Sequence, residues 1–296
     1  MTLHAATWRP DFLASPVEIG SATLRFGENG GRWDPVAFSY GPVRGSATLE
    51  LAAECQADEK CAPKFTLEFG SLDAAALQAA ILGASKPGTL LSSVLARLRP
   101  ASSPHWPELQ GTVRANSFVL GPVTLTDAVA AVRIQADGAE IGSLDAALLG
   151  GRVHAQGSVT PGELPDYKLE GRLDQLNAGE VGQLVGMTWT GTAIDWGGEL
   201  EVSGFTAQDL ATSAKGSLHF DWRHGSIVES GEVETPPVLA KFDRWTAEAA
   251  IADGAITLTK SQVQRGPRKL GVEGSAAFGY PPRVTLGEPP DTRAAS

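Results

Sequence analysis

Apolar and polar residues alternate with a period of two through most of this chain of 296 residues. Between Arg152 and Val159, for example, Val153, Ala155 and Gly157 are separated by polar residues. Successive side chains of a β-strand point to opposite faces, so this alternation predicts strands with one apolar face and one polar face. Such one-sided strands are typical of antiparallel sheets.

About a dozen such runs follow one another, separated by pairs of residues that favour tight turns. The turn pairs are Asn29-Gly30, Asp137-Gly138, His224-Gly225 and Asp253-Gly254. The sequence therefore predicts a mainly all-β fold, a long curved antiparallel sheet or groove built as a meander with a few short helices.

The predicted helices are short and have residues suited to their ends. Asp73 and Asn177 are N-cap candidates, because their side chains can accept hydrogen bonds from free backbone N–H groups. Gly83 and Gly186 follow the last helical residues, where a left-handed backbone conformation is common. The predicted helices span residues 73–82, 89–98 and 177–185.

A repeat of about a hundred residues links these elements. The segment from Phe65 to Gly83 matches the segment from Tyr167 to Gly186 in its order of strand, Leu, helix cap, helix and Gly. Upstream, residues 15–19 match residues 121–125. The predicted division is a first repeat with two helices over 1–100, a second with one helix over 101–190, a third partial repeat with a weak or missing helix over 191–280, and a disordered tail over 281–296.

Many strands with one apolar face need something to cover that face, and three short helices can cover only part of it. The sheet has to close as a barrel, fold over as a sandwich, or curl into a trough that holds an apolar ligand. About twelve strands at about 4.8 Å each extend roughly 55 Å, which favours an elongated groove. The candidate lipid-groove residues are Leu49, Leu67, Phe69, Val153, Leu169, Val202, Phe220 and Trp222.

The alternative is a structural or interaction protein whose apolar face is filled by its own side chains. Tryptophans fit both hypotheses: Trp222 follows Phe220 on the apolar face and could line a lipid path or fill a core. Trp189 and Trp196 could mark the rim of a groove or a packed corner. An outer-membrane barrel fits poorly, since aromatic residues make up only 7% of the chain and form no girdles.

Two segments resemble the AsmA family of bacterial envelope proteins. Leu144-Asp-Ala-Ala-Leu-Leu-Gly-Gly-Arg-Val-His-Ala-Gln-Gly157 resembles the recurring Gly-Gly strand pair of that family, and Phe242 to Gly274 is similar to its closing strands. The resemblance implies a β-groove in the periplasm, anchored to the inner membrane by an N-terminal helix. It also implies roles in phospholipid transport and outer-membrane integrity, with phospholipid acyl chains as ligands, envelope membrane proteins as further candidate partners, and no catalytic residues.

Charge and motifs argue against several other functions. The net charge of −10, without a cluster of basic residues, disfavours binding to nucleic acid. No nucleophile elbow, phosphate-binding loop or dinucleotide fingerprint occurs, so an enzyme and a bound cofactor are not expected. The best candidate metal ligands are His219, Asp221 and His224, but a fourth ligand is lacking and an exposed strand edge is the expected alternative.

The two cysteines, Cys55 and Cys61, stand between two strand-like runs. Their spacing allows a disulfide that closes a hairpin loop, and the alternative is a pair of free surface thiols. A disulfide would indicate an oxidising compartment such as the periplasm.

No stretch approaches the roughly 18 apolar residues that a spanning helix requires. The first ten residues also lack a secretory signal. Either the protein is cytoplasmic or this sequence begins inside a longer protein. Since Leu3 to Phe26 resembles the middle of a repeat, we expect the second.

Overall fold

The computed structural model describes residues 1–9, 16–28, 30–52, 62–74, 76, 108–160, 164–184, 186–204, 206–228, 237–277 and 283–287. Contacts divide the chain into two compact units, unit 1 comprising Met1–Ala146 and Gln156–Glu163, and unit 2 comprising Ala147–Ala155 and Leu164–Ser296. The three predicted repeats are defined by similarity in sequence and not by contacts, so these two units do not test them and the repeats stay a prediction.

Unit 1 consists mostly of strands in its described part. They are β1 (Thr2–Trp8), β2 (Val17–Gly27), β3 (Gly30–Tyr40), β4 (Val43–Ala52), β5 (Lys64–Asp73), β6 (Leu109–Leu120), β7 (Val123–Gln135) and β8 (Gly138–Leu148), and β9 (Gly151–Thr160) contributes residues to both units.

Unit 2 combines strands with two short helices in its described part. They are β10 (Asp166–Leu176), α3 (Ala178–Leu184), β11 (Thr188–Thr190), β12 (Ile194–Ser203), α4 (Ala207–Ser213), β13 (Lys215–Arg223), β14 (Ser226–Val228), β15 (Arg244–Ala252), β16 (Ala255–Arg265), β17 (Arg268–Ala277) and β18 (Arg283–Gly287). The all-β prediction is confirmed.

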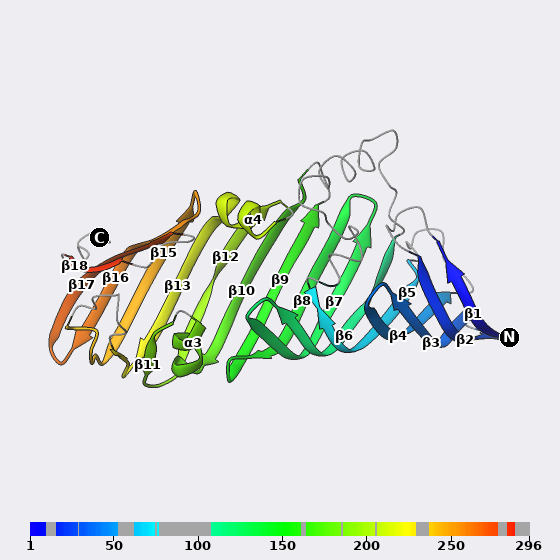
Figure 1. Ribbon diagram of the computed structural model, residues 1–296, viewed down its shortest axis with the longest axis horizontal. Coiled ribbons are helices and arrows are strands. Elements are labelled where there is room, and N and C mark those ends of the chain that lie inside the picture. The colour runs from blue at the N-terminus through cyan, green and yellow to red at the C-terminus, as the bar shows by residue number, and fades with distance from the viewer. Residues whose placement is uncertain are drawn as a thin grey trace. The chain divides into compact units, whose positions relative to one another are not determined.

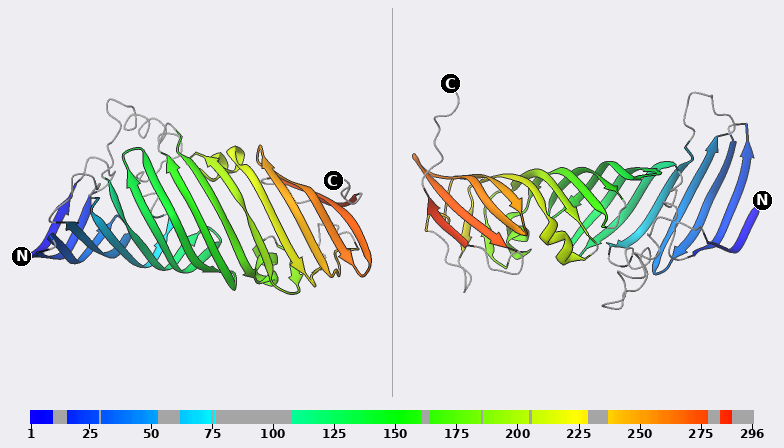
Figure 2. Two further views of the ribbon diagram at one scale, coloured as in Figure 1. Left: turned by 180° about the vertical axis from the view of Figure 1, so that it is seen from behind. Right: turned by 90° about the horizontal axis from the view of Figure 1, so that it is seen from above.

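Among the described residues, the strands follow their sequence order in a 16-stranded sheet, and β11 pairs with β14 in a separate two-stranded sheet (Figure 1). Within each unit, neighbouring strands are rotated relative to one another (Figure 2). The predicted antiparallel order has one exception among the described strand pairs, because β5 and β6 are parallel. Parallel neighbours need a long crossover, and residues 74–108 separate the two strands.

Tight turns explain much of the meander. Asp253 and Gly254 both have positive φ, as a two-residue type I′ turn requires, and they join paired Ala252 and Ala255. Gly41-Pro42 and Gly121-Pro122 join β3 to β4 and β6 to β7, and both glycines have positive φ. Glycine followed by proline suits a type II′ hairpin. The conformational preferences of these two turn residues therefore favour the pairing of the strands that they join.

The helix predicted over residues 177–185 is confirmed as α3. The Asn177 side chain accepts a hydrogen bond from the Glu180 backbone N–H at 3.1 Å. At the other end, the N–H of Gly186 donates to Gln183 and that of Met187 donates to Gly182, which is the Schellman pattern. Gly186 has the positive φ that this C-cap requires.

Near the predicted helix 73–82, the Asp73 carboxylate accepts a hydrogen bond from the Ala76 N–H at 2.7 Å. This is the expected N-cap contact. Ala74 and Ala76 are helical, whereas residues 75 and 77–82 and the whole of the helix predicted over 89–98 lie outside the described residues.

The last third of the chain contains two elements that the sequence did not predict. The α4 helix begins with a capping box that pairs Thr206 with Asp209, and Asp takes the place of the usual Glu or Gln, so its signal in the sequence is weak. In the tail predicted to be disordered, residues 283–287 form β18, which pairs with β17 and corrects the prediction for those residues.

Candidate functional site

In unit 1 the strand register brings the predicted groove residues onto one face. Leu49 pairs with Phe65, and Ala47 pairs with Leu67 on the neighbouring strand. Partners in register point to the same side of a sheet, so Leu49, Leu67 and Phe69 share a face. Phe69 is buried, whereas Leu49 and Leu67 are half-buried.

In unit 2 the candidates also share a face. Leu169 alternates with Tyr167 on β10, and Tyr167 pairs with Val202. On the next strands, Trp196 pairs with Phe220 and Ile194 with Trp222, and both pairs are in phase with Val202.

Val153 joins them through its neighbour Ala155. A Cβ added to Gly171 would lie 2.9 Å from the Cβ of Ala155, so Ala155 and Val153 point to the same side as Leu169. Within each unit the candidates therefore share a face, while the prediction that all eight line one concave surface stays a prediction.

One end of the apolar face of unit 2 is covered by the protein itself. Trp222 is only 1% exposed, stacks on Trp189 with ring centroids 5.0 Å apart, and meets Phe242 edge to face at 5.0 Å. We call this covered part the aromatic core. Its buried residues are Leu176, Ala178, Val181, Ile194, Trp222, Ile227, Val238, Leu239, Phe242, Trp245, Val263 and Val272.

The tryptophans singled out in the sequence lie in or against the aromatic core. Trp222 is buried inside it. Trp189 packs on the core, and Trp196 contacts Phe220 edge to face at 6.5 Å, so both belong to a packed corner. The Trp245 indole donates to the Ser261 hydroxyl at 2.9 Å, whereas the indole N–H groups of Trp189, Trp196 and Trp222 are buried without a partner among the described residues.

The other end of the same face is open. Leu169 is 45% exposed, and Tyr167 and Val202 are half-buried. Burial raises the pKa of the Tyr167 phenol. Leu200 and Leu218 lie between this end and the aromatic core, and both are half-buried. The apolar face of unit 2 thus changes from sealed to exposed along the length of its strands.

The polar face of unit 1 carries a hollow of about 540 Å³ over β4 to β8. Cross-strand pairs such as Thr48 with Thr66 and Glu50 with Lys64 place its side chains opposite the apolar row. The lining residues are Thr48, Glu50, Lys64, Phe65, Thr66, Gln110, Gly111, Thr112, Ala131, Val132, Arg133, Glu140 and Gly142. The lining of this hollow mixes charged and hydroxyl side chains with apolar residues such as Phe65, Ala131 and Val132.

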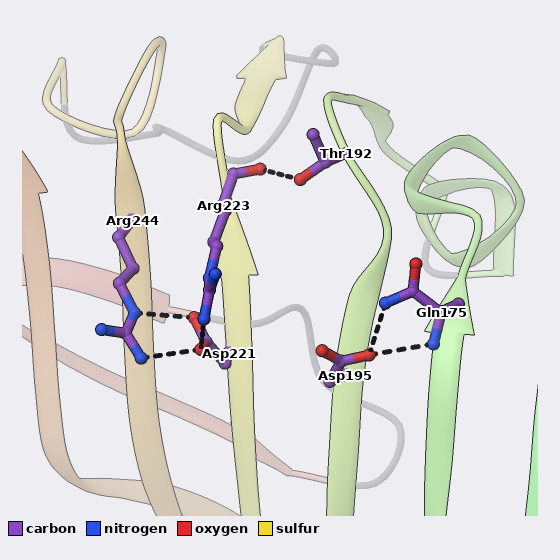
Figure 3. A network of polar contacts seen from close by, with 6 residues as sticks. All are labelled: Gln175, Thr192, Asp195, Asp221, Arg223 and Arg244. Atoms are coloured by element: carbon purple, nitrogen blue, oxygen red, sulfur yellow. Dashed lines mark hydrogen bonds and ion pairs between the residues drawn. The ribbon is translucent and has the colours of Figure 1, made fainter.

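The polar face of unit 2 is organised by ion pairs (Figure 3). Asp221 accepts from Nε and Nη2 of Arg244 at 2.9 and 2.7 Å and also pairs with Arg223 at 3.3 Å. These two cations hold the pKa of Asp221 below its usual range, chiefly through the hydrogen bonds from Arg244. On neighbouring β12, Asp195 accepts from the backbone N–H and side chain of Gln175.

These pairs explain why the candidate metal ligands do not form a site. Asp221 is occupied by two arginines, His219 lies over Gly197, and His224 has a positive φ in the turn after β13. No group of three or more potential metal ligands gathers anywhere in the described part of the chain. His219 is exposed, but the prediction of an exposed strand edge is wrong, because β13 pairs with β12 on one side and with β15 on the other.

Sequence reasoning missed the residues that close the aromatic core. Phe242 precedes β15 and Trp245 is its second residue; both contact Trp222, and Leu239 belongs to the same core. The sequence did offer a signal, since Trp245, Ala247, Ala249 and Ile251 alternate with polar residues.

Cys55 and Cys61 lie outside the described residues, so their disulfide stays a prediction. Among the described residues, no helix has both the length and the apolar character needed to cross a membrane. Comparison with protein-family models, with curated proteins and with solved structures finds no match to the chain.

Proposed function

We propose that this is a non-enzymatic protein of the bacterial cell envelope whose apolar sheet face binds acyl chains during phospholipid transport and outer-membrane biogenesis. The observation that carries the proposal is the one-sided sheet with an uncovered part. Leu169 is 45% exposed on the same face as the sealed aromatic core. The likeness to the AsmA family supports the same function.

Lipid transfer requires a surface that lowers the free-energy cost of exposing an acyl chain to water, and an apolar sheet face is sufficient for this. Exposing an acyl chain to water costs about 0.8 kcal/mol per CH₂, so a chain of about sixteen carbons faces a barrier on the order of 12 kcal/mol. An apolar surface that contacts the chain removes much of this barrier. No catalytic group or cofactor takes part in this process.

The proposed setting follows from the family likeness. In this proposal the protein acts in the periplasm, the full-length protein is anchored to the inner membrane by a segment outside this sequence, and envelope membrane proteins are its partners. Nucleic acid is not a partner, in keeping with the net charge of −10.

A photocrosslinking experiment tests the lipid-binding face. A photoreactive amino acid is placed at Leu67 and Leu169 on the apolar face, with Thr66 and Lys168 as matched neighbours on the polar face. We expect lipid adducts at Leu67 and Leu169 in cells, detected by mass spectrometry after purification from the envelope. Equal labelling at all four positions, or none at the two leucines, would contradict the proposal.

The second candidate function is a structural or interaction protein with a self-filled core. The aromatic core favours it locally, because Trp222 is covered by Trp189 and Phe242 rather than left for a ligand. On this hypothesis, protein purified gently from the envelope carries no lipid in native mass spectrometry. If native mass spectrometry shows protein with bound lipid, the result supports the binding of acyl chains over a self-filled core.

A further inference from the structure

The hollow on the polar face of unit 1 has a floor of threonines. Thr48, Thr66 and Thr112 stand side by side on β4, β5 and β6, since Thr66 is in register with both of the others. All three are half-buried. The row continues to Ala131 on β7, whose small side chain leaves space above the sheet. Hydroxyl groups therefore form the base of this hollow.

Longer side chains form the wall of the hollow. Lys64 is in register with Glu50 on β4 and with Gln110 on β6, and Gln110 is in register with Arg133 on β7. Glu140 on β8 pairs with Arg133. The two cations of the lining are balanced by its two carboxylates, so the hollow has no net charge. This balance favours a neutral ligand over an anion or a cation.

Four adjacent side chains of the hollow make no hydrogen bond or ion pair within the part of the chain that the structure describes. They are those of Lys64 and Thr66 on β5 and of Gln110 and Thr112 on β6. The Arg133–Glu140 pair in the wall is long, at 3.9 Å, and both side chains are more than half exposed. These groups are therefore available to a ligand.

The polar face of unit 2 differs in this respect. Its cross-strand ions are paired closely, with 2.8 Å between Lys168 and Glu201 and 2.8 Å between Lys260 and Glu248. That face uses its charged groups in contacts with one another, whereas the hollow of unit 1 keeps a block of donors and acceptors unused.

These unused groups match the hydroxyl groups of a sugar. A sugar hydroxyl both donates and accepts hydrogen bonds, as do the threonine hydroxyls and the Gln110 amide, while the Lys64 ammonium donates and the Glu50 carboxylate accepts. Thr48 and Thr112 are two strand spacings apart, which is about 10 Å, or about the length of two sugar rings. The volume of about 540 Å³ is also ordinary for a small-molecule site.

We propose that this hollow binds a neutral disaccharide unit across β4, β5 and β6, with its hydroxyl groups bonded to Lys64, Thr66, Gln110 and Thr112. The Ala131 methyl group offers a contact for the C–H groups of a sugar ring. This inference goes beyond the proposed function and does not depend on it, because acyl chains are assigned to the opposite face of the sheet.

Isothermal titration calorimetry on the full chain tests the ligand class. The neutral probes are maltose, cellobiose and N,N′-diacetylchitobiose, and the charged probes are chitobiose, which carries amines in place of the acetamides, and inorganic phosphate. We expect at least one neutral disaccharide to bind, and to bind more tightly than either charged probe. Binding of none of the three, or tighter binding of a charged probe, overturns the inference.

Substitutions test the position of the site. Thr66→Val and Thr112→Val each remove one hydroxyl with little change of shape, so each should weaken binding of that disaccharide about threefold to about tenfold. Ala131→Trp should fill the hollow and abolish binding. Thr257→Val is the matched control, since Thr257 is exposed on β16 in unit 2 and should leave the affinity unchanged.

Thermal melting establishes that each variant is folded. Disaccharide binding that all three hollow variants leave unchanged overturns the site. Lipid crosslinking at Leu67 and Leu169 is measured separately, so a protein that crosslinks lipid but binds no disaccharide refutes only this inference. A protein that binds a disaccharide but no lipid refutes only the proposed function.

Discussion

At the scale of single residues, the same alternation places side chains in different surroundings. Leu169 and Phe220 both occupy apolar positions of their strands, and both are in phase with Val202. Leu169 is 45% exposed, whereas the Phe220 ring meets the Trp245 ring edge to face with centroids 5.0 Å apart. A charge introduced at the two positions should therefore have different effects.

We expect Leu169→Asp to fold and to lose lipid crosslinking, because its carboxylate can stay hydrated. Phe220→Asp should lower the free energy of unfolding by about 3 kcal/mol or more, since it removes an aromatic contact and places a carboxylate against the core. Urea unfolding of both variants, beside the polar-face control Lys168→Asp, measures the difference. Equal losses at Leu169 and Phe220 would contradict the division into an open and a sealed part.

Asp221 makes a pH-dependent contribution to stability. Its pKa is lowered in the folded state, so its ion pairs stabilise the fold above the unfolded pKa of about 3.9 and this stabilisation is lost as pH falls through the folded pKa. Asp221→Asn should cost about 1 kcal/mol at neutral pH, a figure reduced for the exposure of the arginines. Urea unfolding at a series of pH values should show the wild type and the variant converging in acid. A difference that persists unchanged below the folded pKa would refute this account.

At the scale of elements, local hydrogen bonds fix where helices begin and strands turn. The α4 helix has a reciprocal capping box: the Thr206 hydroxyl accepts from the Asp209 N–H at 3.1 Å, and the Asp209 carboxylate accepts from the Thr206 N–H at 3.0 Å. Since α4 has only seven residues, its helix propensity contributes little, and its caps and its packing on β12 hold it in place.

Thr206→Ala should therefore cost about 1 kcal/mol of unfolding free energy. Thr212→Ala is the matched control within the same helix, because the Thr212 hydroxyl only bonds back to the Gln208 and Asp209 carbonyls and its loss should be close to neutral. Chemical denaturation measures both values, and an equal cost for the two threonines would argue against the cap.

At the scale of the whole molecule, two predictions concern the internal repeat and the cellular compartment of the protein. The ends of β5 and β10 are alike, since Leu72 and Leu176 are both buried and the next residue caps a following turn through its side chain. The two copies differ after this point, because β5 pairs with β6 in parallel whereas β10 pairs with β12 antiparallel. The two helices are predicted to occupy equivalent places in their repeats.

The cysteine pair tests the compartment. If the protein is periplasmic, Cys55 and Cys61 should be joined, and the non-reduced peptide from periplasmic protein should be lighter by two hydrogens in mass spectrometry. Protein made in a reducing cytoplasm provides the control with two free thiols. Full alkylation of both cysteines in the periplasmic sample would rule out the disulfide.

The sequence by itself determined the strands, their faces and most of their turns, because these features depend on neighbours in the chain. Residues such as Asp253-Gly254 and Asn177 act within a few positions of themselves, and their predicted turn and cap are found as expected. The shared face of Leu49 and Phe65 also follows from the alternation, since a shift by one residue would bury polar side chains.

Only the tertiary structure decided which part of the apolar face is covered. Trp222 and Leu169 obey the same alternation, yet residues distant in the chain, Trp189 and Phe242, seal Trp222 and leave Leu169 open. The parallel pairing of β5 with β6 likewise arises across residues 74–108, beyond the range of any local pattern. Burial depends on the contacts of distant segments in space, and periodicity along the chain carries no information about which segments will meet.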